Sequence, residues 1–360
     1  MQIVVFILML SVLVLVHEFG HFIVAKFFKM RVEEFGIGLP PRAKTLFTKA
    51  GTIFSLNWLP LGGFVKLYGE DMNDPAQAAS KEAFFNKPKR QRAAVLLAGV
   101  IMNFILGVLA FGVVYTYLGI PTKTDKVIVI EVMKGSPAET AGIKTENTVA
   151  KMSYGKENIA YFNIETFVKQ VDAFKGKEIE MTLVAKNGTE SIVKVTPRLN
   201  PPAGEGALGV ALSNIEMKMY PIWERPFRGV WVGVGESWSW GKEIANNLGT
   251  VMLGIVTGKG VPKDVAGPIG IYQVSKEMYK VGWVAVLQFM AILSINLAIL
   301  NVMPFPALDG GRIFFLGVEM IIGKKLKNKI EGYVHSVGMI FLLGLMVLIT
   351  VRDVIKLIHP

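Results

Sequence analysis

The sequence IVVFILMLSVLVLVHEFGHFIVAKFF, residues 3–28, decides how the rest of the chain is interpreted. It is apolar almost throughout, and it exceeds the roughly 20 residues that a helix needs to cross ~30 Å of hydrocarbon. His17, Glu18 and His21 nevertheless lie inside it. Ionisable side chains are costly to bury in lipid, so three of them in one span indicate a functional site. His17 and His21 share one face of a helix and can bind one metal ion, with Glu18 beside them.

The composition places the chain among membrane proteins that also carry a soluble part. Of 360 residues, 52% are hydrophobic, and the mean hydropathy is +0.45. There is no cysteine, which excludes disulfides, thiolate metal sites and a cysteine nucleophile. The net charge of +11 lies largely in loops beside apolar segments, so we expect contact with membrane lipid and no nucleic-acid partner.

Four segments are apolar enough to span a membrane, and together they predict a multi-pass α-helical membrane protein. We expect the spans at residues 1–28, 93–118, 283–311 and 335–351, where the third includes a short Asp-Gly motif at its end. The first lacks an N-terminal basic residue and a cleavage site, so we expect it to be retained rather than removed as a signal peptide.

The basic residues of the short loops predict the orientation. Residues 29–92 include the run KPKRQR at 87–92, and residues 312–334 include KKLKNK at 324–329. Short basic loops stay in the cytoplasm. Both termini, and the long segment between the second and third spans, are therefore expected on the outer face.

The long outer segment is expected to hold a small α/β domain at residues 126–200. Its helix would follow Asn163 as N-cap, and Asn187-Gly188 would close a β-hairpin. PPAGEG at 201–206 is typical of a boundary loop. Residues 201–282 mix apolar, charged and Trp side chains, which favours amphipathic helices at the membrane surface over a fifth span.

A catalytic zinc site needs a third protein ligand. His335, at the start of the fourth span, is one candidate, and His359 lies at the wrong face. Asp309 is favoured, because it directly follows the third span and its depth matches that of His17 and His21. Zinc there would activate water for peptide hydrolysis with Glu18 as general base. The alternative is that both histidines make buried helix contacts and Asp309 caps a loop.

Several motifs taken together resemble one known family. They are HEFGH at 17–21, LPLGGFVK at 59–66, SINL at 294–297 with LDGG at 308–311, GPIG at 267–270, and GSPA at 135–138. In this order they resemble the site-2 protease family of intramembrane zinc metalloproteases (peptidase family M50), and within it the branch of bacterial regulators of sigma-E. The resemblance covers most of the chain.

The resemblance implies one Zn²⁺ per chain, held by His17, His21 and Asp309, with Glu18 as general base. It implies an enzyme of the bacterial inner membrane that acts in regulated intramembrane proteolysis and stress response. The substrates would be single-pass membrane proteins already shortened by another protease, such as anti-sigma factors, or remnant signal peptides. The outer domain resembles a PDZ domain, and there is room for one such domain, whereas the best-known enterobacterial member has two. A proteolytically inactive adaptor that binds partners through this domain is the alternative, and a transporter is disfavoured because no internal repeat is visible.

Residues for substrate handling are also expected. A membrane-associated β-hairpin at about 52–68, with strands 52–56 and 64–68, would present an edge near Gly63 and Phe64 that pairs with an unwound substrate. Asn301, and less firmly Asn296, would hold substrate backbone in the third span, by the same resemblance. The alternative for both amides is hydrogen bonding between helices.

Overall fold

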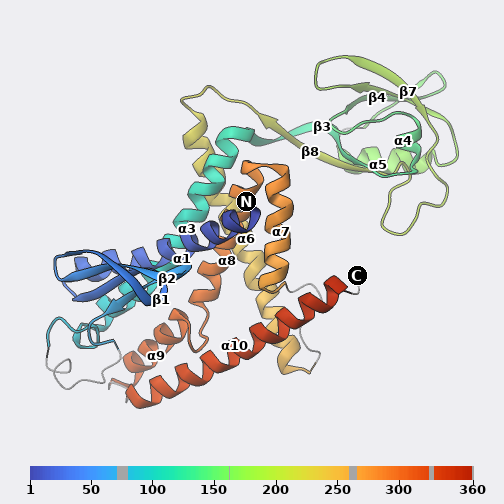
Figure 1. The fold of residues 1–360 in the computed structure, drawn as a ribbon. Coiled ribbons are helices and arrows are strands. Elements are labelled where there is room, and N and C mark those ends of the chain that lie inside the picture. Colours follow the sequence, from blue (N-terminus) through green and yellow to red (C-terminus); the bar gives the residue numbers. More distant parts are fainter. Residues whose placement is uncertain (71–79, 162, 259–265, 324–327, 359–360) are drawn as a thin grey trace. The chain divides into compact units, whose positions relative to one another are not determined.

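The computed structural model describes residues 1–360 except 71–79, 162, 259–265, 324–327 and 359–360 (Figure 1). The chain forms two compact units. The first combines Met1–Tyr117 with Ile222–Pro360, and the second is Leu118–Pro221. The catalytic candidates all lie in the first unit.

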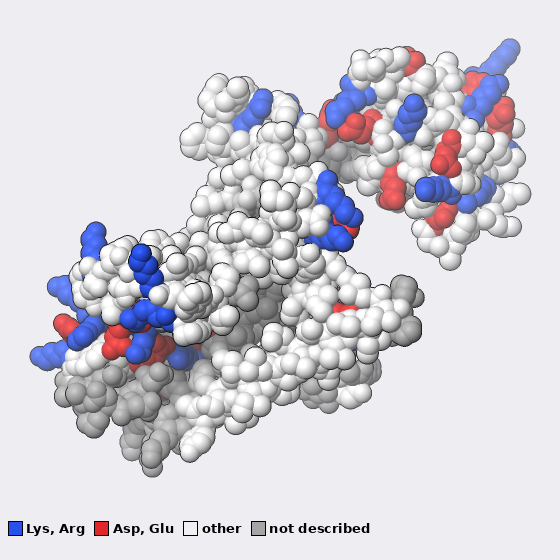
Figure 2. Space-filling model, in the orientation of Figure 1, with Lys and Arg blue, Asp and Glu red and all other residues white. Residues whose placement is uncertain are grey.

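Four helices of the described residues are long and apolar enough to cross a membrane, as expected. They are α1 (Gln2–Phe27), α3 (Lys89–Leu118), α8 (Trp283–Val302) and, within α10 (Asn328–Ile358), the part Gly332–Ile358. Large areas of the helical surface carry no charged side chain, and charges gather over the neighbouring β-hairpin (Figure 2). An uncharged surface of this kind suits hydrocarbon.

Residues 225–256 form one helix, α6 (Arg225–Val256). Thr116 Oγ1 donates to the Arg225 carbonyl at 3.3 Å, and a Cβ on Gly229 would lie 2.5 Å from the Gly112 carbonyl oxygen. α6 therefore packs antiparallel along α3, and its position at the membrane surface stays a prediction. Glycines on both helices, Gly112 and Gly229, allow this close approach.

The segment expected as a loop at 312–334 is mostly helical. α9 (Asp309–Ile322) occupies its first part, Gly323 ends that helix with φ +76°, and α10 has already begun at Asn328. A left-handed glycine is a common helix terminator. The rest of the basic run, Lys324–Lys327, lies outside the described residues.

The β-hairpin of the first unit is built differently from the expectation. β1 (Val32–Lys49) pairs with β2 (Thr52–Leu67). Residues 34–37 of β1 pair on one side with 53–56 and on the other with 63–66 of the same strand β2. Segments 52–56 and 64–68 thus flank β1 instead of pairing with each other, because residues 34–37, which precede both in the sequence, pair with each of them.

Glu34 holds this small sheet together. Its carboxylate accepts hydrogen bonds from Arg42 Nε at 2.9 Å and from Ser55 Oγ at 2.6 Å, and a second Arg42 nitrogen also contacts it. Burial alone would raise the pKa of Glu34, but these bonds outweigh it and hold the pKa below its usual value. The ionised form of Glu34 is therefore favoured at this position between the paired strands.

The second unit is an α/β domain with a sheet of strand order β7-β6-β4-β3-β8, and β5 pairs with β4. Its core includes Phe167, Met181 and Leu183. Asn163 forms a capping box at the start of α5, as expected, and β6 and β7 form the hairpin around Asn187-Gly188. The elements are β3 (Ile120–Val132), α4 (Pro137–Thr140), β4 (Thr148–Tyr154), β5 (Glu157–Ile159), α5 (Ile164–Ala173), β6 (Ile179–Val184), β7 (Glu190–Val195) and β8 (Val210–Lys218).

The boundaries of this domain differ from the expected 126–200. β3 begins at Ile120, and β8 pairs along it, with Ile120 opposite Lys218 and Val132 opposite Val210. The Pro- and Gly-rich segment 201–206 is therefore a loop inside the domain. Turn-forming residues mark a loop but do not say whether the chain returns to the same sheet.

Among the described residues of the first unit, the remaining helices are η1 (Phe84–Asn86) and α7 (Pro268–Val281). Asp353, near the end of α10, is 7% exposed. Its Oδ2 accepts the backbone N–H groups of Gly267 at 2.9 Å and Gly270 at 2.8 Å. A carboxylate from a distant helix thus caps the start of α7, where free N–H groups favour an anion.

We predict that Asp353→Ala lowers the thermal stability of the purified chain. The buried N–H of Gly267 and the half-buried N–H of Gly270 lose their acceptor, at a cost of about 1–3 kcal/mol. Asp353→Asn is the matched control, since it keeps one acceptor oxygen and is expected to lose less. A melting temperature for Asp353→Ala equal to that of the native chain would show that this contact does not hold α10 to α7.

Candidate active site

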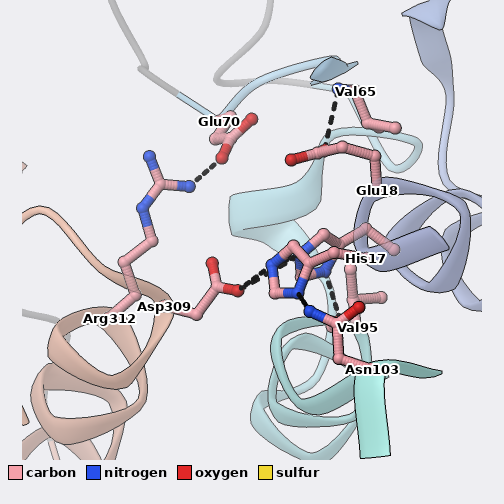
Figure 3. A network of polar contacts seen from close by, with 9 residues as sticks. His17, Glu18, Val65, Glu70, Val95, Asn103, Asp309 and Arg312 are labelled. Atoms are coloured by element: carbon pink, nitrogen blue, oxygen red, sulfur yellow. Dashed lines mark hydrogen bonds and ion pairs between the residues drawn. The ribbon is translucent and has the colours of Figure 1, made fainter. Parts of the chain in front are cut away.

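Three metal-ligating atoms converge where α1 meets the start of α9. The Nε2 atoms of His17 and His21 lie 3.1 Å apart, and Asp309 Oδ2 lies 3.0 Å from the first and 3.1 Å from the second. Both histidines are buried, and Asp309 is half-buried. The spacing of four residues on α1 turns both rings to the same side, where the carboxylate of Asp309 meets them (Figure 3).

A break between α8 and α9 brings Asp309 into position. α8 ends at Val302 and α9 begins at Asp309, and Pro304 and Pro306 lie between them, where proline interrupts a helix. A Cβ on Gly310 would overlap the Met303 carbonyl, so this tight return of the chain requires glycine.

A buried ion pair fixes α9 further along its length. Arg92 Nη1 on α3 lies 2.9 Å from Glu319 Oε2, and both side chains are almost fully buried. Lys89 Nζ donates to the Glu319 carbonyl at 2.6 Å. Breaking a buried pair leaves an uncompensated charge, so this contact strongly fixes α9, and with it Asp309, against α3.

α3 passes directly behind the two imidazole rings. His21 Nδ1–H donates to the Val95 carbonyl at 2.8 Å. A Cβ on Gly99 would lie 2.6 Å from His17 Cε1 and 2.6 Å from His21 Nε2. A side chain at residue 99 would therefore occupy the space of both rings. The bond to Val95 places the proton of His21 on Nδ1, which leaves Nε2 free to bind a metal.

The side chain of Glu18 points toward the β-sheet and away from the cluster of His17, His21 and Asp309. Its Oε2 accepts the backbone N–H of Val65 at 3.0 Å (Figure 3). Val65 pairs with Phe35 of β1, and its N–H faces away from β1, toward α1. The outer edge of β2 at 63–67 thus lies beside Glu18.

These groups line one cavity of about 550 Å³. Charged Glu70 and Arg312, which form an ion pair, contribute to the wall. The wall also contains apolar side chains of α3 and α10, so the site combines ligating and charged groups with apolar ones, as substrate sites usually do.

The donor set fits a divalent metal of the zinc type. Two imidazoles and one carboxylate are the ligands of several catalytic zinc sites. Their mutual distances of 3.0–3.1 Å are close to the ~3.3 Å expected between tetrahedral ligands with bonds of about 2.0–2.1 Å. Three protein ligands also leave a fourth position for water or substrate.

The expected substrate residues divide into two groups. Phe64 lines the cavity, and Gly63 is its buried neighbour on the same edge. Neither Asn301 nor Asn296 is among the described residues that line the cavity; Asn301 is buried and Asn296 is half-buried in α8.

His335, the other histidine considered as a ligand within the described residues, is not in the cluster of three. His335 lines the cavity, and its Nδ1 accepts the Ala307 N–H at 2.9 Å. His359 lies outside the described residues. The choice of Asp309 over His335 as the third member of the cluster therefore agrees with the geometry.

Sequence reasoning missed the residues of α3. Asn103 is fully buried and its amide nitrogen lies 3.3 Å from His17 Nδ1. The polar amide of Asn103 inside an apolar span is a sequence feature that indicates a functional role. Gly99 gives no such indication, because a glycine in a membrane helix is common and only the neighbouring helix shows why it is needed.

Comparison with known proteins assigns the family. The model of peptidase family M50 matches residues 5–345. A Clostridium acetobutylicum protein described as a candidate zinc metalloprotease is 33% identical over 98% of this chain and 97% of its own length. The zinc metalloproteases RasP of Oceanobacillus iheyensis and Geobacillus kaustophilus are 28% and 27% identical, over 99% of this chain and 99% and 98% of their own lengths. The chain therefore belongs to peptidase family M50.

We predict that Gly99→Ala sharply lowers the amount of divalent metal that the purified chain retains, because the added methyl displaces both rings. The matched control is Gly235→Ala on α6, where an added Cβ meets nothing within 4 Å. Metal content measured by atomic emission is expected to fall only in the first variant. Equal metal in both would mean that the rings tolerate the methyl.

Proposed function

We propose that this chain cleaves peptide bonds within the membrane-spanning segments of other proteins. Membership of peptidase family M50, together with relatives named zinc metalloproteases, makes the chain a zinc metalloprotease. The observation that carries the intramembrane step is the position of the cluster. His17 and His21 lie inside a helix long and apolar enough to cross a membrane. Asp309 reaches them from the start of α9, seven residues after a second such helix ends at Val302.

The residues of the site divide the chemistry among themselves. His17, His21 and Asp309 would hold zinc, which supplies Lewis acidity that polarises the scissile carbonyl and lowers the pKa of a water molecule to about 7. Glu18 takes the proton of the attacking water and passes it to the leaving amine. Oε2 accepts the Val65 N–H, which orients the carboxylate and leaves Oε1 for the proton of the water.

The edge of β2 supports a way to present the substrate. A helical peptide bond is sheltered, so the segment must first unwind, and an open strand edge offers it backbone partners. Residues 63–67 form such an edge, and Phe64 and Val65 line the cavity beside Glu18. The substrate would lie along this edge as an added strand, with Gly63 and Phe64 in contact and the hairpin dipping into the membrane.

Further parts of the proposal concern partners and location. The substrates are single-pass membrane proteins shortened beforehand, such as anti-sigma factors or remnant signal peptides. The enzyme lies in the bacterial inner membrane with both termini and the PDZ-like second unit on the outer face, and the positive charge of the loops supports this orientation. Asn301 and Asn296 hold substrate backbone only if α8 rearranges, since their present positions favour helix contacts.

We predict that Glu18→Gln keeps about one zinc per chain and lowers cleavage of a transmembrane model substrate by at least ~10²-fold, since a general base is lost. His21→Ala is expected to lose both zinc and activity. Near-native cleavage by Glu18→Gln would remove Glu18 from the mechanism. A native chain without zinc would instead favour the adaptor.

A second prediction tests the added strand. The chain has no cysteine, so one cysteine at Phe64 in the Glu18→Gln background can be cross-linked to a substrate whose single cysteine is moved residue by residue. Cross-linking that alternates with a period of two indicates a strand, because side chains alternate in β structure. The control is a cysteine at Phe47 on the opposite edge of the sheet. A period of three to four, or equal cross-linking from Phe47, would contradict edge pairing.

A further inference from the structure

Asn103 occupies the one polar position of α3 that faces the ligand cluster. Val95, Gly99 and Asn103 are spaced by four residues and therefore share a face of the helix. The Val95 carbonyl contacts His21, Gly99 makes room for both rings, and the Asn103 amide reaches His17 (Figure 3). Asn103 is 0% exposed, so its amide cannot turn to water.

In the side-chain amide of Asn103, the nitrogen contacts His17 and the oxygen has no hydrogen-bond partner among the described residues. Nδ2 lies 3.3 Å from His17 Nδ1, whereas Oδ1 is buried and has no hydrogen-bond partner among the described residues. The backbone at this position is fixed separately, because Ser294 Oγ donates to the Asn103 carbonyl at 2.7 Å. An amide held at its backbone and buried without full partners usually has a functional reason.

The tautomer of His17 decides which end of the amide faces the ring. His17 Nε2 is the atom next to His21 and Asp309, so it is the atom that would bind a metal. A ligating nitrogen carries no proton, and the neutral ring then carries its proton on Nδ1, which must donate. The amide NH₂ cannot accept that proton, but the carbonyl oxygen can.

A half-turn of the amide exchanges its oxygen and nitrogen with little change in the position of either atom. Such exchanges are assigned from the hydrogen-bond network and not from the atomic positions. We propose that, with metal at Nε2, Asn103 presents Oδ1 to the Nδ1–H of His17 and so fixes this ring in its ligating tautomer. In the other orientation Nδ2–H donates to Nδ1, and His17 Nε2–H donates to Asp309 across their 3.0 Å contact.

Asn103 is thus a positioning residue that serves both tautomers of His17. Asparagine suits this role because its side chain offers both an acceptor and a donor. An outer partner of a metal-binding histidine commonly sets metal affinity by about 10–100-fold. This inference rests on the proposed zinc site, which it extends to a residue of a third helix.

The test measures zinc affinity of the full-length chain in detergent by competition with a chelator, together with the melting temperature of the metal-free form. Asn103→Leu, which has similar size but no acceptor, is expected to weaken zinc binding about 10–100-fold without lowering the metal-free melting temperature. Asn103→Asp restores an acceptor and is expected to bind zinc within a few-fold of the native chain. If Asn103→Leu does not fold, Asn103→Ala takes its place.

A packing control and the opposing outcomes complete the test. Ser294→Ala removes the bond to the Asn103 backbone but leaves the amide in place, so it is expected to keep zinc affinity. The inference is overturned if Asn103→Leu binds zinc like the native chain, or if Asn103→Asp loses as much affinity as Asn103→Leu. A native chain that binds no zinc would instead overturn the proposed function, and this inference with it.

Discussion

The close approach of α3 to α1 is the constraint on which the site depends. Two imidazoles cannot lie side by side in an apolar helix unless something fixes their rings and shields them from lipid. α3 positions the rings, because Gly99 leaves space for them and the Val95 carbonyl accepts from His21, and both histidines are buried. A Cβ on Gly20 would lie 2.5 Å from the Ala98 carbonyl oxygen, so α1 also needs a glycine for the same contact. Glycines at helix contacts let membrane helices approach closely.

The ligands come from opposite ends of the sequence, and the local structure around each one follows from its own segment. His17 and His21 need only a helix, and Asp309 needs only the break that Pro304 and Pro306 impose. What brings them together is tertiary. The pair Arg92–Glu319 joins the beginning of α3 to α9 deep in the protein, at a place where water cannot compensate for either charge. The helix that shapes the back of the site thus also fixes the helix that carries the third ligand.

Much of this arrangement was predictable from sequence because the signals were local or strongly periodic. The four apolar spans, the Asn163 cap and the meeting of His17, His21 and Asp309 follow from segment length, capping chemistry and depth. The failures share one cause. Residues 52–56 and 64–68 were paired with each other because they are close in sequence, whereas both pair with 34–37. The predicted end of the second unit fell before β8 for the same reason, and the contacts of Gly99 and Asn103 depend on neighbours that the sequence does not reveal.

The second unit leaves and rejoins the chain through two neighbouring strands. Ile120 lies opposite Lys218 where β3 begins and β8 ends, and in the first unit Thr116 contacts the Arg225 backbone where α3 ends and α6 begins. Both sides of the junction are therefore closed independently, as in domains that tolerate insertion. A change of length or sequence inside this insertion therefore leaves intact the contact between α3 and α6 that closes the helical unit.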